Sequence, residues 1–405
     1  MADGRLWALL VLAGGAGAVA AVSCFVQGYE VTEPTPVTDA GSGGSGGGSG
    51  CGHATWPDPP AAADPGVDDL DLVVAVHTID FKEADAKATT GPTVGYDLDS
   101  HCTCQGQGNS CTEPAWATAS NCDGPAGRDN AWVYIFAAAN LFNSGISSAG
   151  YSAQVAAGDF TALVRVRGYN GKPNDDQVSV ATYPSGGLKS DPCGAPDHTP
   201  RWDGTDRWPI IYTSLVGAGG GGGFAPTGGG GGCGGGGSTG PPGLSLDDPK
   251  YVDTHGYVAD GVLVASIPEL GIMLTGDVNA TELKVKAAFV TGKLQQLPPD
   301  NHWVIRQGLL VGRIEVSEVF RTLSTMVITQ GQICTDNPLY SWVKNAVCRY
   351  PDVASVIGGP TTPCDAISFG MAFEADPAGL GLIYVPTGTP AQCPPATDPA
   401  NDHCG

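Results

Sequence analysis

The cysteine pattern constrains this chain more than any other feature of its sequence. The chain has thirteen cysteines in 405 residues, and the first of them, Cys24, follows a stretch that is typical of an export signal. The twelve that remain are an even number, as is common in disulfide-bonded proteins of an oxidising compartment. We therefore expect an exported protein whose loops are clamped by disulfides.

The N-terminal segment predicts export and a lipid anchor. Residues 1–23 read as a signal peptide, with Arg5, a short apolar run and small residues before a cysteine. The apolar run is too short and too rich in glycine for a good membrane span. Ala21-Val22-Ser23-Cys24 resembles a bacterial lipobox, although Ala21 stands where leucine is usual. In this interpretation Cys24 carries a lipid that holds the protein to the membrane. The alternative is an ordinary signal peptide that contains Cys24.

Phe25 indicates where the anchored protein is located, and the overall charge indicates which partners it can bind. Phe25 is not the aspartate that usually signals inner-membrane retention, so we expect the bacterial outer membrane or cell surface. The chain carries 41 acidic and 19 basic side chains, a net charge of −22. Such a chain repels phosphate backbones, and we expect no nucleic-acid partner.

Glycine and proline tracts suggest the domain boundaries. Residues 24–66 are predicted to be a disordered Gly/Ser/Pro tether, because they have too little apolar surface to offset the entropy of ordering. A folded domain is expected over residues 67–385 and a proline-rich tail over residues 386–405. The glycine-rich tract 217–243 is flanked on both sides by incomplete β-structure. We therefore favour an insertion in one domain over an interdomain linker, since the cost of closing a loop grows slowly with its length.

The folded region is predicted to be mainly β. Its apolar runs are short and alternate, as in residues 160–169, where Val164 and Val166 share one face. Helical spacing is limited to a few segments, such as residues 315–323. We expect an antiparallel β-sandwich-like domain with a few helices, and α+β as the alternative. Other expected strands cover residues 70–76, 177–183, 208–212, 257–267, 271–275, 281–291, 303–311, 367–373 and 380–385, and other expected helices begin near residues 131, 153 and 338.

A loop rich in cysteine and aspartate, residues 95–130, is the strongest candidate for a metal site. Four cysteines could clamp it with two disulfides, and hard oxygen ligands on a stapled loop suit calcium. The spacing is not that of an EF-hand. The alternative is that these residues form turns and cap a helix. The candidate calcium ligands are Asp97, Asp99, Asp123, Asp129 and Asn130.

The same loop also has ligand types that suit zinc, namely His101, Cys102, Cys104 and Cys111. In an exported chain we favour oxidised cysteines over this zinc site. The remaining cysteines are expected to pair elsewhere. Cys193 and Cys233 could pair across the glycine insertion, while Cys334, Cys348, Cys364, Cys393 and Cys404 would secure the C-terminal helix and tail, with Cys51 spare or joining them.

Two tryptophans suggest a surface that binds saccharide. Residues 201–208 combine aromatic and charged side chains, so Trp202 and Trp208 are the candidate ligand-binding residues. The alternative is a pair of core or hairpin tryptophans.

Catalytic motifs are almost missing from the sequence. Gly43-Gly44-Ser45-Gly46-Gly47 matches G-x-S-x-G, but it lies in low-complexity sequence where a nucleophile elbow cannot form. We therefore favour a non-enzymatic binding or structural protein, whose partner is a saccharide or a surface protein. The alternative is an extracellular hydrolase that works through carboxylates.

Four segments support a resemblance to known proteins: Gly95-Tyr96-Asp97-Leu98-Asp99, Asp129-Asn130-Ala131, residues 167–171 and residues 364–370. With these segments the chain resembles a group of secreted lipoproteins from myxobacteria. The resemblance implies export and a lipid anchor. It assigns no activity and no functional residue.

Overall fold

The computed structural model describes residues 51–119, 122–140, 146–191, 199–218, 243–275, 280–328, 331–356, 360–385 and 392–405. In these ranges the chain forms twelve strands and four α-helices, which confirms the prediction of a mainly β domain with a few helices. Cys24 and the rest of residues 1–50 lie outside the described residues, as do Cys193, Cys233 and most of the glycine-rich tract.

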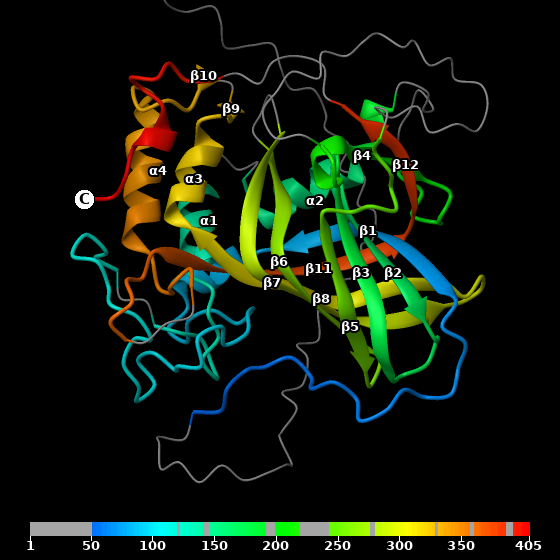
Figure 1. Cartoon of the computed structure of the whole chain (residues 1–405). Coiled ribbons are helices and arrows are strands. Elements are labelled where there is room, and N and C mark those ends of the chain that lie inside the picture. The colour runs from blue at the N-terminus through cyan, green and yellow to red at the C-terminus, as the bar shows by residue number, and fades with distance from the viewer. Residues whose placement is uncertain are drawn as a thin grey trace, which may run out of the picture. The chain divides into compact units, whose positions relative to one another are not determined.

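Ten strands belong to one sheet, in the order β12-β4-β3-β2-β1-β11-β8-β7-β6-β5. β5 also pairs with β3, so the eight strands from β3 to β5 form a closed antiparallel ring. In Figure 1, β2, β3 and β5 cross in front of β8. The strands are β1 (Leu70–Asp80), β2 (Thr161–Tyr169), β3 (Asp175–Ser185), β4 (Arg207–Ile211), β5 (Tyr251–Ala259), β6 (Val262–Thr275), β7 (Ala280–Leu297), β8 (His302–Glu315), β11 (Ala366–Pro377) and β12 (Gly379–Tyr384).

The closed ring refines the predicted sandwich. Its neighbours pair antiparallel as expected, but its facing walls are parts of one sheet and not two separate sheets. β4 and β12 extend the sheet past β3 and pair in parallel with each other. A short separate pair is formed by β9 (Val327–Ile328) and β10 (Gly331–Gln332).

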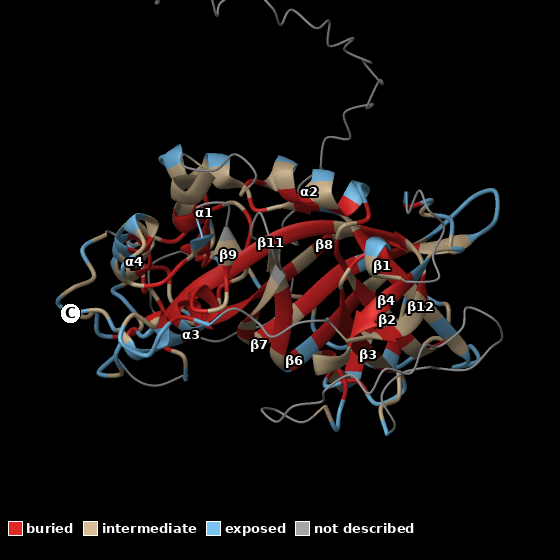
Figure 2. Ribbon diagram, turned by 90° about the horizontal axis from the view of Figure 1, so that it is seen from above, coloured by how far each residue is buried: buried red, intermediate tan, exposed pale blue. Residues whose placement is uncertain are grey.

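Alternation along the strands places one face inside the ring and the other against a second core. On β3, Val178 and Val180 belong to the main core, whereas Ala181 and Tyr183 pack in a second cluster with Trp208. This period of two is the geometry of any β-strand. The buried side chains therefore form two clusters, one on each face of β3, and the buried residues are drawn as red ribbon in Figure 2.

Four α-helices cover the edges and one face of the sheet. α1 (Trp132–Asn140) and α2 (Ser148–Ala156) lie over the face seen at the top of Figure 2, and α3 (Val316–Leu323) and α4 (Pro338–Arg349) lie together beyond one end. The predicted start of α4 is explained by its cap. The Asn337 side chain accepts a hydrogen bond from the Leu339 backbone N–H, and Pro338 occupies the first turn.

The described domain begins earlier than the sequence suggested. Residues 51–66, which the composition predicts to be part of the tether, lie against the domain. The Trp56 ring stacks on Phe289 with centroids 3.7 Å apart, and the Tyr257 hydroxyl donates to the Pro57 carbonyl at 2.5 Å. The tether boundary at residue 66 is therefore wrong, because Trp56 contributes apolar surface that the proline-rich sequence around it concealed.

Both flanks of the glycine-rich tract belong to the same sheet region. The Val216 N–H donates to the Asp248 carbonyl at 2.9 Å, and the Lys250 N–H donates to the Ser214 carbonyl at 2.8 Å. The last described segment, residues 392–405, is also attached, since the Tyr340 hydroxyl donates to the Asp402 carboxylate at 2.7 Å.

Candidate functional site

Three disulfides hold the loop of residues 95–130. Cys104 pairs with Cys122 inside the loop, Cys102 pairs with Cys51, and Cys111 pairs with Cys364 next to β11. The prediction of two disulfides within the loop is therefore wrong. Only one is internal, while the other two fasten the loop to distant parts of the chain. Sequence spacing cannot reveal such pairings, because they depend on the topology of the sheet.

The disulfides also decide the zinc hypothesis. Cys102, Cys104 and Cys111 are all oxidised, so none of them has a thiolate to offer a metal. The prediction of oxidised cysteines is therefore confirmed, and the zinc alternative is wrong. In the C-terminal region Cys334 pairs with Cys393 and Cys348 with Cys404, which joins the region of α4 to the tail as expected. The expectation is wrong for Cys364 and Cys51, because each of them pairs with a cysteine of the loop.

Three of the predicted calcium ligands converge. Carboxylate oxygens of Asp97, Asp99 and Asp129 lie within 4.8 Å of one another. Local turns orient the first two, since the Ser100 N–H donates to Asp97 Oδ1 at 2.6 Å and the His101 N–H donates to Asp99 Oδ1 at 2.9 Å. Asp97 and Asp99 thus form turns, as the alternative interpretation expected, and their carboxylates also converge with that of Asp129.

Asp129 reaches the same point from the other end of the loop. Its Oδ2 accepts the Leu98 N–H at 2.6 Å, and its own N–H donates to the Tyr96 carbonyl at 3.1 Å. The loop backbone is packed closely here, because a Cβ on Gly124 would lie 1.6 Å from the Pro92 carbonyl oxygen. Glycine at this position lets the two loop segments meet.

Two further aspartates complete an acidic cluster, which we define as Asp97, Asp99, Asp123, Asp129 and Asp352. Asp123 Oδ2 accepts the Thr103 N–H at 2.5 Å, and Asp352 Oδ1 accepts the Ser368 N–H at 2.8 Å. Asp123 and Asp352 line a hollow of about 10 Å³. Sequence analysis missed Asp352, because it lies more than two hundred residues from the loop and no local motif marks it.

Burial and mutual repulsion raise the pKa values of Asp99, Asp123, Asp129 and Asp352. Desolvation is the main cause in every case, followed for Asp129 by the charges of neighbouring aspartates. The pKa of Asp129 lies well above its ordinary value, that of Asp123 is raised to about 8 and that of Asp352 to about 7. The carboxyl groups of Asp123 and Asp129 are within hydrogen-bonding reach of each other, a contact that needs a shared proton or a cation.

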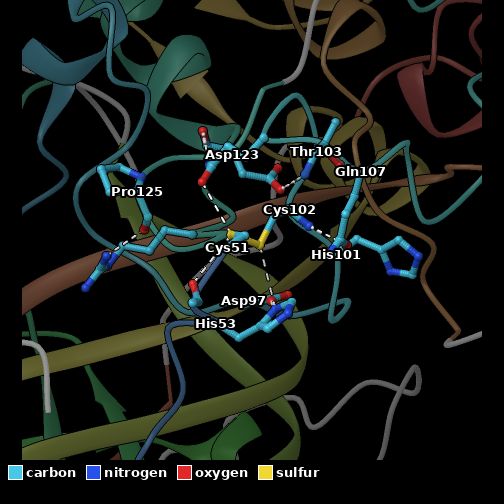
Figure 3. The surroundings of a disulfide bond; sticks show 12 residues. Cys51, His53, Asp97, His101, Cys102, Thr103, Gln107, Asp123 and Pro125 are labelled. Atoms are coloured by element: carbon cyan, nitrogen blue, oxygen red, sulfur yellow. Dashed lines mark hydrogen bonds and ion pairs between the residues drawn. A yellow bond between two sulfur atoms is a disulfide. The ribbon is translucent and has the colours of Figure 1, made fainter. Parts of the chain in front are cut away.

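A few basic side chains face the acidic cluster. Arg313 is only 4 % exposed, and its Nη2 donates to the Leu98 carbonyl. Burial lowers its pKa, whereas Asp129, Asp99 and Asp352 raise it. The His53 ring contacts the Asp97 carboxylate beside the Cys51–Cys102 disulfide, as Figure 3 shows. The His101 imidazole also lies close to Asp99. Among the described residues, the cluster thus has five carboxyl groups against one guanidinium and two imidazoles.

Asn130 does not belong to the site, contrary to the prediction. Its side-chain amide donates to the Val94 carbonyl at 3.0 Å and to the Gly370 carbonyl at 3.1 Å, and its Oδ1 accepts the Gly370 N–H at 2.9 Å. The amide is therefore fully used in joining the loop to β11. Its sequence position beside Asp129 suggested a ligand, but its side chain serves the fold.

The proposed saccharide surface is also wrong. Trp208 is fully buried in the second core, and Trp202 is half-buried between Trp208 and His77, with ring centroids 5.4 Å and 4.6 Å away. A fully buried ring cannot stack on a sugar. The core-pair alternative describes these two tryptophans.

Several observations bear on where the protein works. Five disulfides in the described ranges indicate an oxidising, extracellular environment. Across the same ranges, none of the helices has both the length and the apolar character needed to cross a membrane.

A comparison with family models, curated proteins and solved structures finds no match for the chain.

Proposed function

We propose that this is an exported, lipid-anchored surface protein that acts as a calcium-supported binding or structural module. The observation that carries the proposal is the convergence of the Asp97, Asp99 and Asp129 carboxylates in a disulfide-held loop. Calcium prefers six to eight oxygen ligands at about 2.3–2.6 Å, most often from carboxylates, carbonyls and water. These three side chains would supply the first oxygens, and Asp123 lies beside them.

The charge of the acidic cluster supports a cation. Five carboxyl groups with one guanidinium and two imidazoles nearby leave excess negative charge, which a low-dielectric interior strongly disfavours. Protons neutralise it when the pKa values are raised, as they are for Asp123 and Asp352. A divalent cation does the same at neutral pH and releases those protons on binding.

The size of the hollow favours a binding role over hydrolysis. A carboxylate-based hydrolase needs two facing carboxyl groups in a cleft that admits its substrate. Asp123 and Asp352 do have raised pKa values, but the hollow that they share has a volume of only about 10 Å³, room for about one water-sized particle. A saccharide does not fit there.

The lipid anchor is proposed from the sequence alone. Cys24 would carry the lipid, and residues 25–50 would link it to the domain. In a bacterial host we expect the parent in the membrane fraction and the Cys24→Ala variant released from it. A Cys24→Ala variant that stays in the membrane fraction to the same extent would contradict the anchor.

The calcium proposal is tested by thermal unfolding of the disulfide-intact protein at pH 8. With calcium at about 100 times its dissociation constant the folded state gains about 2.7 kcal/mol, which corresponds to a rise in melting temperature of about 5 °C. Magnesium at equal concentration should give a smaller rise. Equal melting temperatures in calcium and in chelator would contradict the proposal.

Asp129→Asn is the decisive variant in this experiment. It should abolish the rise with calcium. In chelator its melting temperature should equal or exceed that of the parent, because an amide removes a buried charge and can donate to Asp123. Asp300→Asn, at an exposed position, is the matched control and should keep the full response to calcium.

A further inference from the structure

The closed sheet holds a second site that goes beyond the proposed function. A partly open cavity of about 60 Å³ lies inside the ring of strands. It shares no residue with the acidic cluster. Its lining comes from β1, β2, β3, β6, β7, β8, β11 and α2 and includes Phe81, Tyr151, Phe160, Val164, Thr182 and Phe373.

α2 closes one end of this cavity. The Ser148 hydroxyl accepts the Phe81 N–H at 2.8 Å, and the Ser152 hydroxyl accepts the Ile79 N–H at 3.1 Å and donates to the Ile79 carbonyl at 3.0 Å. These bonds fasten the helix to the end of β1. Tyr151, which is buried, then packs on Phe81 and Phe160 over the cavity.

The cavity wall is apolar except for a few hydroxyl groups. The Thr161 hydroxyl is occupied, because it donates to the Val76 carbonyl at 2.6 Å. Thr182 is 5 % exposed, and among the described residues its Oγ1 has no hydrogen-bond partner. An unpaired buried hydroxyl costs about 1–3 kcal/mol. Thr182 Oγ1 can therefore form a favourable hydrogen bond with a polar group of a ligand.

Water is a poor occupant of this space. A buried water usually makes about three hydrogen bonds, whereas the described lining offers one unpaired side-chain oxygen. Apolar surface and a single hydrogen-bonding atom are instead the usual composition of a small-molecule pocket.

We propose that the cavity binds a small, mainly apolar molecule that carries one hydrogen-bonding group, such as a hydroxyl. The apolar part lies among Phe81, Phe160, Val164 and Phe373, and the polar group pairs with Thr182 Oγ1. The closed ring of strands thus encloses a binding site for a small hydrophobic ligand. This site is separate from the acidic cluster, where calcium is proposed to bind.

The test uses two molecules of nearly the same shape and of a size that suits the cavity, 1-propanol and butane, titrated into the full protein by calorimetry. The parent should bind both, with a negative heat-capacity change from apolar burial. Thr182→Val should weaken the binding of 1-propanol about tenfold, equivalent to ~1.4 kcal/mol, and leave the binding of butane unchanged. The exposed Thr254→Val on β5 is the matched control and should change neither.

Ala162→Leu, which adds carbon atoms to the cavity wall, should abolish the binding of both molecules. Thr182→Val is expected to fold as well as the parent, because it removes only an unpaired hydroxyl, and its melting temperature checks this. Two results would overturn the proposal: no binding of either molecule by the parent, or equal loss of both molecules in Thr182→Val. Both are independent of calcium, so failure here leaves the acidic cluster untouched.

Discussion

At the residue scale, neighbouring side chains in the loop have different tasks. Asp129 points into the acidic cluster, whereas Asn130 points out of it and joins β11 through Gly370. The sequence places both in one candidate site, because adjacent polar residues look alike without a backbone. The distinction matters for mutagenesis, since loss of Asn130 should affect folding and loss of Asp129 should affect calcium.

Asn130→Ala is predicted to destabilise the protein by about 2–4 kcal/mol. The substitution leaves the Val94 carbonyl and both backbone groups of Gly370 without their partner, and each buried unpaired group costs about 1–3 kcal/mol. Urea unfolding measures the change. The increase in melting temperature with calcium should persist in this variant. Loss of that increase would indicate that Asn130 contributes to calcium binding.

Stability without calcium is predicted to fall as pH rises from about 5 to 8. The folded pKa values of Asp123 and Asp352, about 8 and about 7, lie above the ordinary value of 3.8. In this window the folded state holds protons that the unfolded state has released, so each further unit of pH favours unfolding. The lowered pKa values of Asp376 and Asp402 act below pH 4, outside the window.

Urea unfolding in chelator at pH 5, 6.5 and 8 measures this slope. Asp352→Asn should make it shallower, because it removes one titrating group. Calcium should also flatten it by replacing the protons. Stability that rises across this range in the parent would contradict the raised pKa values.

At the element scale, the strands and helices were largely predictable and their connections were not. The alternation of Val164 and Val166 and the Asn337 cap mark their elements from local sequence alone. The edge partner of β3 and the pairing of Cys111 with Cys364 depend on residues far away in the chain. Local periodicity determines which face of a strand is buried, but many different strand orders would bury the same faces.

The long-range disulfide is predicted to stabilise the fold more than the local one. Cys111 and Cys364 are 253 residues apart, whereas Cys104 and Cys122 are 18 apart. Since the loop-closure entropy grows with the logarithm of loop length, replacing the first pair by serine should cost about 2 kcal/mol more than replacing the second. Guanidinium unfolding of the two double variants compares them. Equal losses would show that the loop is held mainly by packing.

At the scale of the whole molecule, closure of the sheet between β3 and β5 creates the interior. Gly256 lies at this junction opposite Val178, and a Cβ there would be 3.1 Å from Val180 Cγ2 and 3.1 Å from the Val264 carbonyl oxygen. A side chain at this junction would therefore force its neighbours to shift by a few tenths of an ångström. Of the candidate site, the sequence identified four of the five aspartates, but the fifth comes from the other end of the chain.

Gly256→Val is predicted to destabilise the protein by about 1–3 kcal/mol through overpacking and to speed hydrogen exchange in β3 and β5 together. Gly108→Val is the control, because Gly108 is exposed and has open space around it. Its effect should stay within about 0.5 kcal/mol. Faster hydrogen exchange in β5 alone would mean that β3 and β5 are not paired in solution.

The most direct test of calcium binding at the acidic cluster is a crystal structure of the disulfide-intact protein grown with calcium at pH 8. We predict density for one ion that is bound by Asp97, Asp99 and Asp129, with oxygen distances of about 2.3–2.6 Å. The contrary result is a cluster without an ion, in which carboxyl groups pair directly by sharing protons. That result would make the loop a structure held by disulfides and protons alone.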